Sequence, residues 1–128
     1  MAIKEEVADA IGEIEATFEG ATVSVDEDGD GGAYVIVDPV DPGEPYEQDE
    51  TWIGFQITFQ YPLSDVYPHF VRADLRRNDG AGLVEGMSMG SWRERQAVQI
   101  SRRSNHLDPQ TDTAVIKLHK VLDWLRTR

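Results

Sequence analysis

The spacing of hydrophobic positions predicts a helix at each end of the chain. Within residues 1–18, apolar side chains recur at intervals of three and four, which places them on one face of an amphipathic helix. They are Ile3, Val7, Ala10, Ile11, Ile14 and Phe18. Near the other end, Asp108-Pro109 stops the preceding segment, and Thr111, Asp112 or Thr113 can cap a new helix. The apolar stripe of that helix consists of Ala114, Val115, Leu118, Val121, Leu122 and Leu125.

Strict alternation between the two helices predicts strands. Residues 21–26 and 33–38 flank an Asp/Gly-rich turn, which is the signature of a hairpin. Residues 52–61 form the clearest strand. One of its faces carries Ile53, Phe55, Ile57, Phe59 and Tyr61, and the other carries Trp52, Gly54, Gln56, Thr58 and Gln60. Residues 70–75 predict a fourth strand.

The remaining segments predict loops. Residues 39–50 contain three prolines among acids, and residues 78–90 contain four glycines. Residues 96–101 predict either a fifth strand or the start of an extended loop. The expected fold is therefore α+β and covers residues 1–128 as one domain. It has an N-terminal helix, a four-stranded antiparallel meander, a proline-rich corner and a C-terminal helix.

The amino-acid composition excludes thiol chemistry and membrane-spanning segments. The 128 residues include no cysteine, which excludes disulfides, thiolate metal sites and a cysteine nucleophile. No apolar run approaches the roughly 20 residues of a membrane span, and the acidic N-terminus is unlike a signal peptide. We therefore expect a cytoplasmic protein with no membrane partner.

Charge is distributed unevenly along the chain. The formal net charge is -12, which argues against a nucleic-acid partner because phosphate contacts need a basic domain. Residues 1–60 hold 16 acidic residues and one basic residue, whereas residues 61–128 hold 8 acidic and 11 basic residues. This asymmetry favours a protein partner reached by electrostatic steering, although acidity can also serve solubility alone.

Metal and cofactor chemistry finds little support. Asp26, Asp28, Asp30 and Gly31 match the first positions of a calcium loop, but Val37 occupies the place of the required final acid. An acidic hairpin turn explains this segment better. His69, His106 and His119 show no ligand spacing. We therefore expect no metal and no cofactor.

Two hydrolase-like or phosphate-like patterns are also better explained as loops. Ser104, His106 and Asp108 alternate on one short segment, without a nucleophile elbow or an oxyanion glycine. The glycines at 80, 82 and 86 lack the strand-to-helix context of a phosphate loop.

Two other segments indicate a specific structural or binding role more strongly than these patterns do. Tyr61-Pro62 and Tyr67-Pro68 cannot continue a sheet, and an aromatic residue before proline favours a cis bond, so they predict a rigid structural corner. The second segment combines an indole with four arginines, and Trp and Arg dominate binding hot spots. Its candidate binding residues are Trp92, Arg93, Arg95, Arg102, Arg103 and Asn105.

Taken together, these elements resemble the ubiquitin-conjugating (UBC, or E2-like) fold in its prokaryotic versions. Residues 55–59 look like the third strand of that family, and Tyr61-Pro62 resembles its Tyr-Pro corner. Pro68 falls at the final corner proline, Phe70 opens the fourth strand, and residues 112–125 resemble the helix after the active-site region.

The departures from the family concern its chemistry. Conjugating enzymes carry ubiquitin on a cysteine after a His-Pro-Asn element, and this chain has neither. By register, the lost cysteine falls near Gln96, Ala97 and Val98. A serine such as Ser104 is a poor substitute without an activating base. The resemblance therefore implies an inactive variant, a pseudoenzyme with no catalytic residue.

The implied role is that of a non-catalytic accessory or adaptor in a bacterial ubiquitin-like conjugation pathway. Its expected partners are a ubiquitin-like protein and a conjugating or activating enzyme of that pathway, and a homo- or heterodimer fits this role. Two alternatives stay open. One is an active conjugating enzyme whose cysteine has been replaced near Ala97, and the other is an unrelated α+β protein-binding module.

Overall fold

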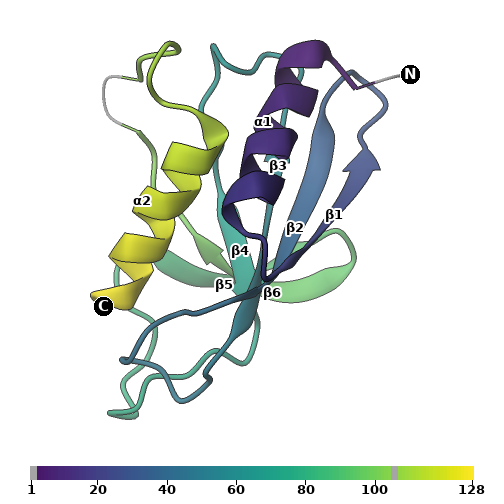
Figure 1. Cartoon of the computed structure of the whole chain (residues 1–128). Coiled ribbons are helices and arrows are strands. Elements are labelled where there is room, and N and C mark those ends of the chain that lie inside the picture. Colours follow the sequence, from purple (N-terminus) through teal and green to yellow (C-terminus); the bar gives the residue numbers. More distant parts are fainter. Residues whose placement is uncertain (1–2, 105–106) are drawn as a thin grey trace.

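The computed structural model describes residues 3–104 and 107–128. Two helices, α1 (Glu5–Thr17) and α2 (Ala114–Arg126), lie side by side on one face of an antiparallel sheet (Figure 1). Within the described residues, the sheet has six strands in the order β1-β2-β3-β4-β6-β5. They are β1 (Thr22–Glu27), β2 (Ala33–Val40), β3 (Thr51–Ile57), β4 (His69–Arg72), β5 (Met87–Trp92) and β6 (Arg95–Ile100). The α+β class is confirmed.

The expected four-stranded sheet is wrong because the second half of the chain adds a hairpin. Residues 87–92, expected to be part of a loop, form β5, and β6 realises the fifth strand considered for residues 96–101. β6 inserts between β4 and β5, with Val71 opposite Val98 and Met87 opposite Ile100. Hairpin pairing with β6, which is itself paired with β4, thus outweighs the low strand propensity of a glycine-containing segment.

Strand ends also differ from the expected ones. β3 stops at Ile57, so Phe59 lies outside the strand, is 51% exposed and does not share the buried face of Phe55 and Ile57. β4 is shorter than the expected 70–75 segment. In the expected loop 39–50, β2 continues through Val40, and Tyr46 is buried and bridges to Arg77.

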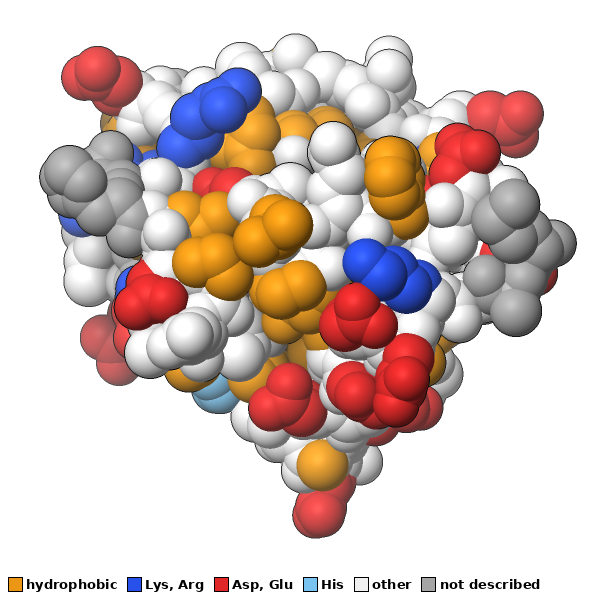
Figure 2. All heavy atoms as spheres, turned by 90° about the horizontal axis from the view of Figure 1, so that it is seen from above, with side chains coloured by type: hydrophobic (Ala, Val, Ile, Leu, Met, Phe, Trp, Pro, Cys, Tyr) orange, Lys and Arg blue, Asp and Glu red, His pale blue; other side chains and the backbone are white. Residues whose placement is uncertain are grey.

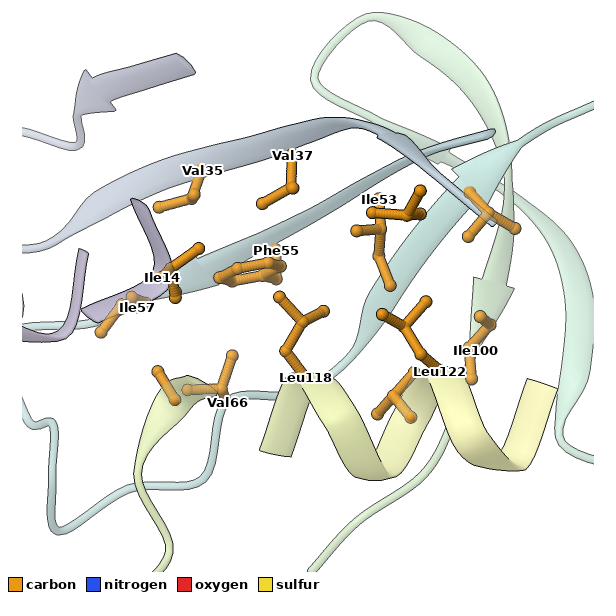
Figure 3. Close-up of a cluster of buried hydrophobic side chains, with 14 of the residues drawn as sticks. Ile14, Val35, Val37, Ile53, Phe55, Ile57, Val66, Ile100, Leu118 and Leu122 are labelled. Atoms are coloured by element: carbon orange, nitrogen blue, oxygen red, sulfur yellow. The ribbon is translucent and has the colours of Figure 1, made fainter. Parts of the chain in front are cut away.

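The main core lies between the sheet and the two helices. The apolar stripes expected for the terminal helices are buried at Val7, Ala10, Ile11 and Ile14 in α1, and at Ala114, Leu118, Val121, Leu122 and Leu125 in α2. In Figure 3, Phe55 and Ile53 of β3 point toward Leu118 and Leu122 of α2. Alternation along β3 therefore places one side of this strand against the helices, as the pattern predicts.

Turns at two ends of these elements are closed by polar side chains. Thr113, one of the three expected caps, accepts a hydrogen bond from the backbone N–H of Ile116 at the start of α2. In the β1–β2 turn, one Asp28 oxygen accepts hydrogen bonds from the backbone N–H groups of Asp30 (2.8 Å) and Gly32 (3.0 Å).

Within residues 3–104 and 107–128, no group of three or more His, Asp or Glu side chains is arranged to hold a metal ion. No helix in this part of the chain is long and apolar enough to span a bilayer.

Candidate protein-binding surface

The turn between β5 and β6 has a strained backbone. Trp92 pairs with Arg95, so only Arg93 and Glu94 form the turn. Both adopt positive φ angles, 48° and 75° respectively. Such two-residue turns favour Asn-Gly, and a left-handed conformation costs a residue with a Cβ roughly 1–2 kcal/mol. Arg93 and Glu94 nevertheless occupy these two positions, in spite of the conformational cost.

The hairpin tip folds back over the sheet face that the helices leave uncovered. There the Trp92 ring stacks on Trp52 of β3, with centroids 5.8 Å apart, and meets the edge of Tyr34 of β2 at 6.4 Å. A Cβ on Gly54 would come within 2.9 Å of two Trp92 ring carbons. Gly54 lies between Ile36 and Phe70 across three strands, so its missing side chain leaves the space that the indole fills.

Two arginines cover this aromatic cluster. The Arg93 guanidinium lies 4.3 Å from the centre of the Tyr34 ring and pairs with Asp26 of β1 at 2.7 Å. The Arg95 guanidinium lies 5.1 Å from the Trp52 ring. Among the described residues, no carboxylate lies within ion-pairing distance of Arg95. Stacking therefore orients its planar donors while leaving them available to an acidic group of a partner.

We call Tyr34, Trp52, Trp92, Arg93 and Arg95 the aromatic–arginine surface. Beside it lies a concavity of about 520 Å³, lined by Tyr34, Ile36, Trp92, Arg93, Glu94 and Arg95. Rigid aromatic area next to oriented guanidinium groups is the composition typical of binding hot spots. The surface therefore has the composition of a contact region for a protein partner.

The structure divides the candidate binding residues into two groups. Trp92, Arg93 and Arg95 meet on the aromatic–arginine surface, whereas Arg102 and Arg103 lie beside α2. There their guanidinium groups cover Trp124 at 5.2 Å and Tyr67 at 4.4 Å respectively. Asn105 lies outside the described residues.

Tyr34, Trp52, Gly54 and Phe70 were not among the expected binding residues. A sequence signal exists for Trp52 and Gly54: a glycine inside a predicted strand, next to a tryptophan, marks a close approach by another segment. That signal gives no indication of which segment approaches.

The proposed position of a lost cysteine falls in the middle of β6. Ala97 is fully buried against Phe70 and Trp92 on the aromatic side, and Val98 is fully buried on the helix side. Only Gln96 is exposed. A thiol at 97 or 98 would therefore be covered by neighbouring side chains. The loss of a cysteine in this region stays a hypothesis.

The proline corner anchors the start of α2. Both Tyr61–Pro62 and Tyr67–Pro68 are cis, in line with the bias expected for these aromatic–proline steps. The buried Tyr61 hydroxyl accepts a hydrogen bond from the backbone N–H of Ala114 at 3.0 Å, and burial raises the pKa of Tyr61. Leu63 in the same corner is 76% exposed. Figure 2 shows an end of the molecule where hydrophobic side chains lie exposed beside clustered carboxylates.

Beside the corner, Lys117 of α2 is buried in a polar cluster. Its ammonium donates to Asp65 Oδ2 (3.0 Å), to the Arg102 carbonyl (2.6 Å) and to Ser104 Oγ (3.0 Å). Ser104 in turn donates its N–H and hydroxyl to Asp65. Burial on its own would raise the pKa of Asp65, but the bonds from Ser104 and Lys117 outweigh it and lower the pKa.

This cluster holds structure together and offers no activated nucleophile. All three ammonium protons of Lys117 have acceptors, one of which is Ser104 Oγ, so Lys117 acts as a donor toward Ser104. The cluster ties the loop after β6 to both α2 and the corner. Of the alternating residues Ser104, His106 and Asp108, His106 lies outside the described residues.

His69 of β4 lies on the same side of the sheet and is fully buried. Its ring packs 5.1 Å from that of Phe55, and neither ring nitrogen has a hydrogen-bond partner among the described residues. Burial, helped by the positive charge of Lys117 and opposed by Asp65, lowers the pKa of His69 to about 3. His69 is therefore neutral in the folded protein at neutral pH.

Comparison of the chain with models of protein families, with curated proteins and with solved structures found no match. The function of the chain is consequently inferred from its own residues. Of its surfaces, the aromatic–arginine surface combines a strained backbone, stacked aromatic rings and an arginine without a carboxylate partner among the described residues.

Proposed function

We propose that the chain is a non-catalytic, E2-like adaptor of a bacterial ubiquitin-like conjugation pathway, which binds its protein partner through the aromatic–arginine surface. The observation that carries this proposal is the strained β5–β6 turn, which keeps Arg93 and Glu94 at positive φ over stacked tryptophans. Backbone strain persists where the surrounding structure holds it in place, and it concentrates at functional sites.

The order of elements supports the E2-like part of the proposal. An N-terminal helix precedes an antiparallel sheet, a Tyr-Pro corner follows β3, and a helix ends the chain. The β5–β6 hairpin is an addition to the four-stranded meander that the resemblance implies. The absence of cysteine supports a role without thioester transfer.

The chemistry of the surface favours a partner with an acidic and apolar contact region. Arg95 has oriented donors and no carboxylate partner among the described residues, and the half-buried rings of Tyr34 and Trp52 offer apolar area beside it, whereas Trp92 is buried beneath them. Because Arg93 already pairs with Asp26, Arg95 is the stronger anchor for an incoming carboxylate. This pattern would also fit an unrelated α+β binding module, which differs in the identity of its partner.

The burial of Ala97 argues against the alternative of an active enzyme whose cysteine was replaced there. A thioester needs a sulfur that a partner protein can approach, and position 97 lies beneath Trp92 and Phe70. Restoring cysteine at 96, 97 and 98 in turn and testing for a thioester-linked product separates this alternative from the adaptor role.

The test reconstitutes the pathway from purified components. The chain is mixed with a ubiquitin-like protein, an activating enzyme and a conjugating enzyme of a bacterial conjugation pathway, with ATP, and its binding to each component is measured by calorimetry. We expect a non-covalent complex and no adduct on this chain. Arg95→Glu should weaken the complex by at least about tenfold, because it replaces a charge-assisted contact with repulsion.

Arg76→Glu is the matched control, since Arg76 is 73% exposed and its only ion pair among the described residues is a 3.8 Å contact with Glu47. A covalent adduct on this chain would refute the non-catalytic role. Binding to none of the components would leave the unrelated module, and equal weakening by both variants would show that net charge, not this surface, governs binding.

A further inference from the structure

A second basic site lies between the loop after β6 and helix α2. A cavity of about 170 Å³ is lined there by Arg102, Arg103, Ser104, Lys117, Lys120, Val121 and Trp124. Four of these seven side chains are cationic and none is acidic. In a chain with 24 acidic and 12 basic residues, such a local excess of positive charge is unexpected.

Two of the four cations are already matched by carboxylates. Lys117 pairs with Asp65 at 3.0 Å, and Lys120 pairs with Asp112 at 3.3 Å. Within the described part of the chain, neither Arg102 nor Arg103 has a carboxylate at ion-pair distance. The cavity therefore has a net excess of two positive charges, both carried by guanidinium groups.

Most of the hydrogen-bond donors at the cavity have no acceptor among the described residues. The guanidinium groups of Arg102 and Arg103 donate to no other described residue, and Lys120 uses one of its three protons, on Asp112. The acceptors nearby are already engaged, since the Arg102 carbonyl and Ser104 Oγ both accept from Lys117. A ligand that fills the donors must bring acceptor oxygens of its own.

Stacking restricts how the two arginines present these donors. The Arg102 guanidinium lies over the Trp124 ring and that of Arg103 over the Tyr67 ring, so each planar group is held against an aromatic face. A planar fork of this kind matches the paired oxygens of a phosphate or a carboxylate. The cavity is smaller than the roughly 300 Å³ lower limit of drug-sized sites, so it suits one compact group.

We propose that this cavity, formed by Arg102, Arg103, Lys120 and Trp124, binds a compact oxyanion, either a phosphate group or a terminal carboxylate. Arg102 and Arg103 supply the contacts, Lys120 adds a donor, and Lys117 contributes charge while its protons stay engaged. The site is separate from the aromatic–arginine surface, which uses Arg93 and Arg95.

The test is a titration of the full ¹⁵N-labelled chain, observed through the Trp124 indole N–H and the arginine Nε–H signals. Inorganic phosphate and acetate are added in separate arms, and sodium chloride at matched ionic strength is the third arm. We expect saturable shifts at Trp124, Arg102 and Arg103 with an oxyanion and none with chloride. Saturation by phosphate alone identifies a phosphate group as the ligand chemistry, and saturation by acetate identifies a carboxylate.

The double variant Arg102→Gln/Arg103→Gln should weaken binding by about a hundredfold, roughly tenfold for each charge-assisted contact. Its matched control, Arg76→Gln/Arg95→Gln, removes the same charge elsewhere and should bind the oxyanion like the parent chain. Lys120→Gln should weaken binding by a smaller factor.

Shifts that are equal with chloride, absent with both oxyanions, or reduced equally by the control would overturn the proposal. Because Arg95→Gln lies on the aromatic–arginine surface, loss of partner binding without loss of oxyanion binding distinguishes failure of one proposal from failure of the other. Dispersed amide spectra confirm that each variant is folded. If the double variant does not fold, the single substitutions at Arg102 and Arg103 are tested in its place.

Discussion

Lowering the pH from about 7.5 to about 5 should destabilise the protein through His69. This side chain is fully buried on β4, and burial together with the nearby Lys117 lowers its pKa to about 3. In the unfolded chain the same imidazole titrates near its ordinary pKa of about 6.5. Between these two pKa values, the imidazole therefore binds a proton in the unfolded state and not in the folded state.

The sign and size of the effect follow from this difference in pKa. A lowered folded-state pKa means that the His69 contribution is complete above about pH 6.5 and is lost as the pH falls toward 3. At about pH 5 the unfolded imidazole is almost fully protonated and the folded one is neutral. The free energy of unfolding should therefore fall by about 2 kcal/mol between pH 7.5 and 5 on account of His69.

Urea unfolding, followed by tryptophan fluorescence at both pH values, measures this loss. Carboxylates such as Asp65 also titrate, so the informative quantity is the difference between the parent chain and His69→Leu. The variant should lose about 2 kcal/mol less over the same interval. His119→Gln, at an exposed position where the ring stacks on Phe18, is the control and should lose as much as the parent.

Equal losses of stability in the parent and in His69→Leu would refute this reasoning. So would an NMR titration in which the His69 ring protons shift near pH 6 in the folded state. The same variant removes two ring nitrogens that have no hydrogen-bond partner among the described residues. At neutral pH it should therefore be at least as stable as the parent.

Three further substitutions test separate parts of the structure. Gly54→Ala should lower the free energy of unfolding by about 1–3 kcal/mol, because its Cβ would lie 2.9 Å from ring carbons of Trp92, and it should reduce the near-UV circular dichroism of the stacked indoles. Gly12→Ala in α1 is the control: a Cβ there has no neighbour within 4 Å, so this variant should not be destabilised. Lys117→Met should lower the free energy of unfolding by about 3 kcal/mol by leaving Asp65 unpaired, and removing both charges should recover most of that loss in urea titrations. Glu94→Gly should raise the thermal midpoint, since glycine relieves up to about 1–2 kcal/mol of strain at φ 75°; an unchanged midpoint would show that the turn is relaxed.

The elements with strong local periodicity were predictable from sequence. Both helices and the core-facing side of β3 follow from spacings of three, four and two residues, because periodicity fixes which side chains share a face. The hairpin β5–β6 was only partly predictable. Met87–Trp92 has weak local preference, and its strand conformation depends on pairing with β6.

The candidate site shows the same division. Trp92, Arg93 and Arg95 were predictable as binding residues because indole and guanidinium groups gather within four positions of the sequence. Their separation from Arg102 and Arg103 was not, since it depends on β6 leading the chain from the hairpin tip to a loop that lies beside α2. Sequence proximity grouped residues that the fold assigns to two different surfaces.

The amino-acid sequence by itself determined the α+β class, the terminal helices, the Tyr-Pro corner and the absence of thiol chemistry. These are local or compositional properties, and they need no knowledge of distant contacts. The tertiary structure decided that Trp92 lies over Gly54, that Arg93 reaches Asp26 across 67 positions of sequence, and that Lys117 and His69 are buried. Each of these depends on long-range strand pairing and helix packing, which bring together residues whose local patterns give no sign of one another.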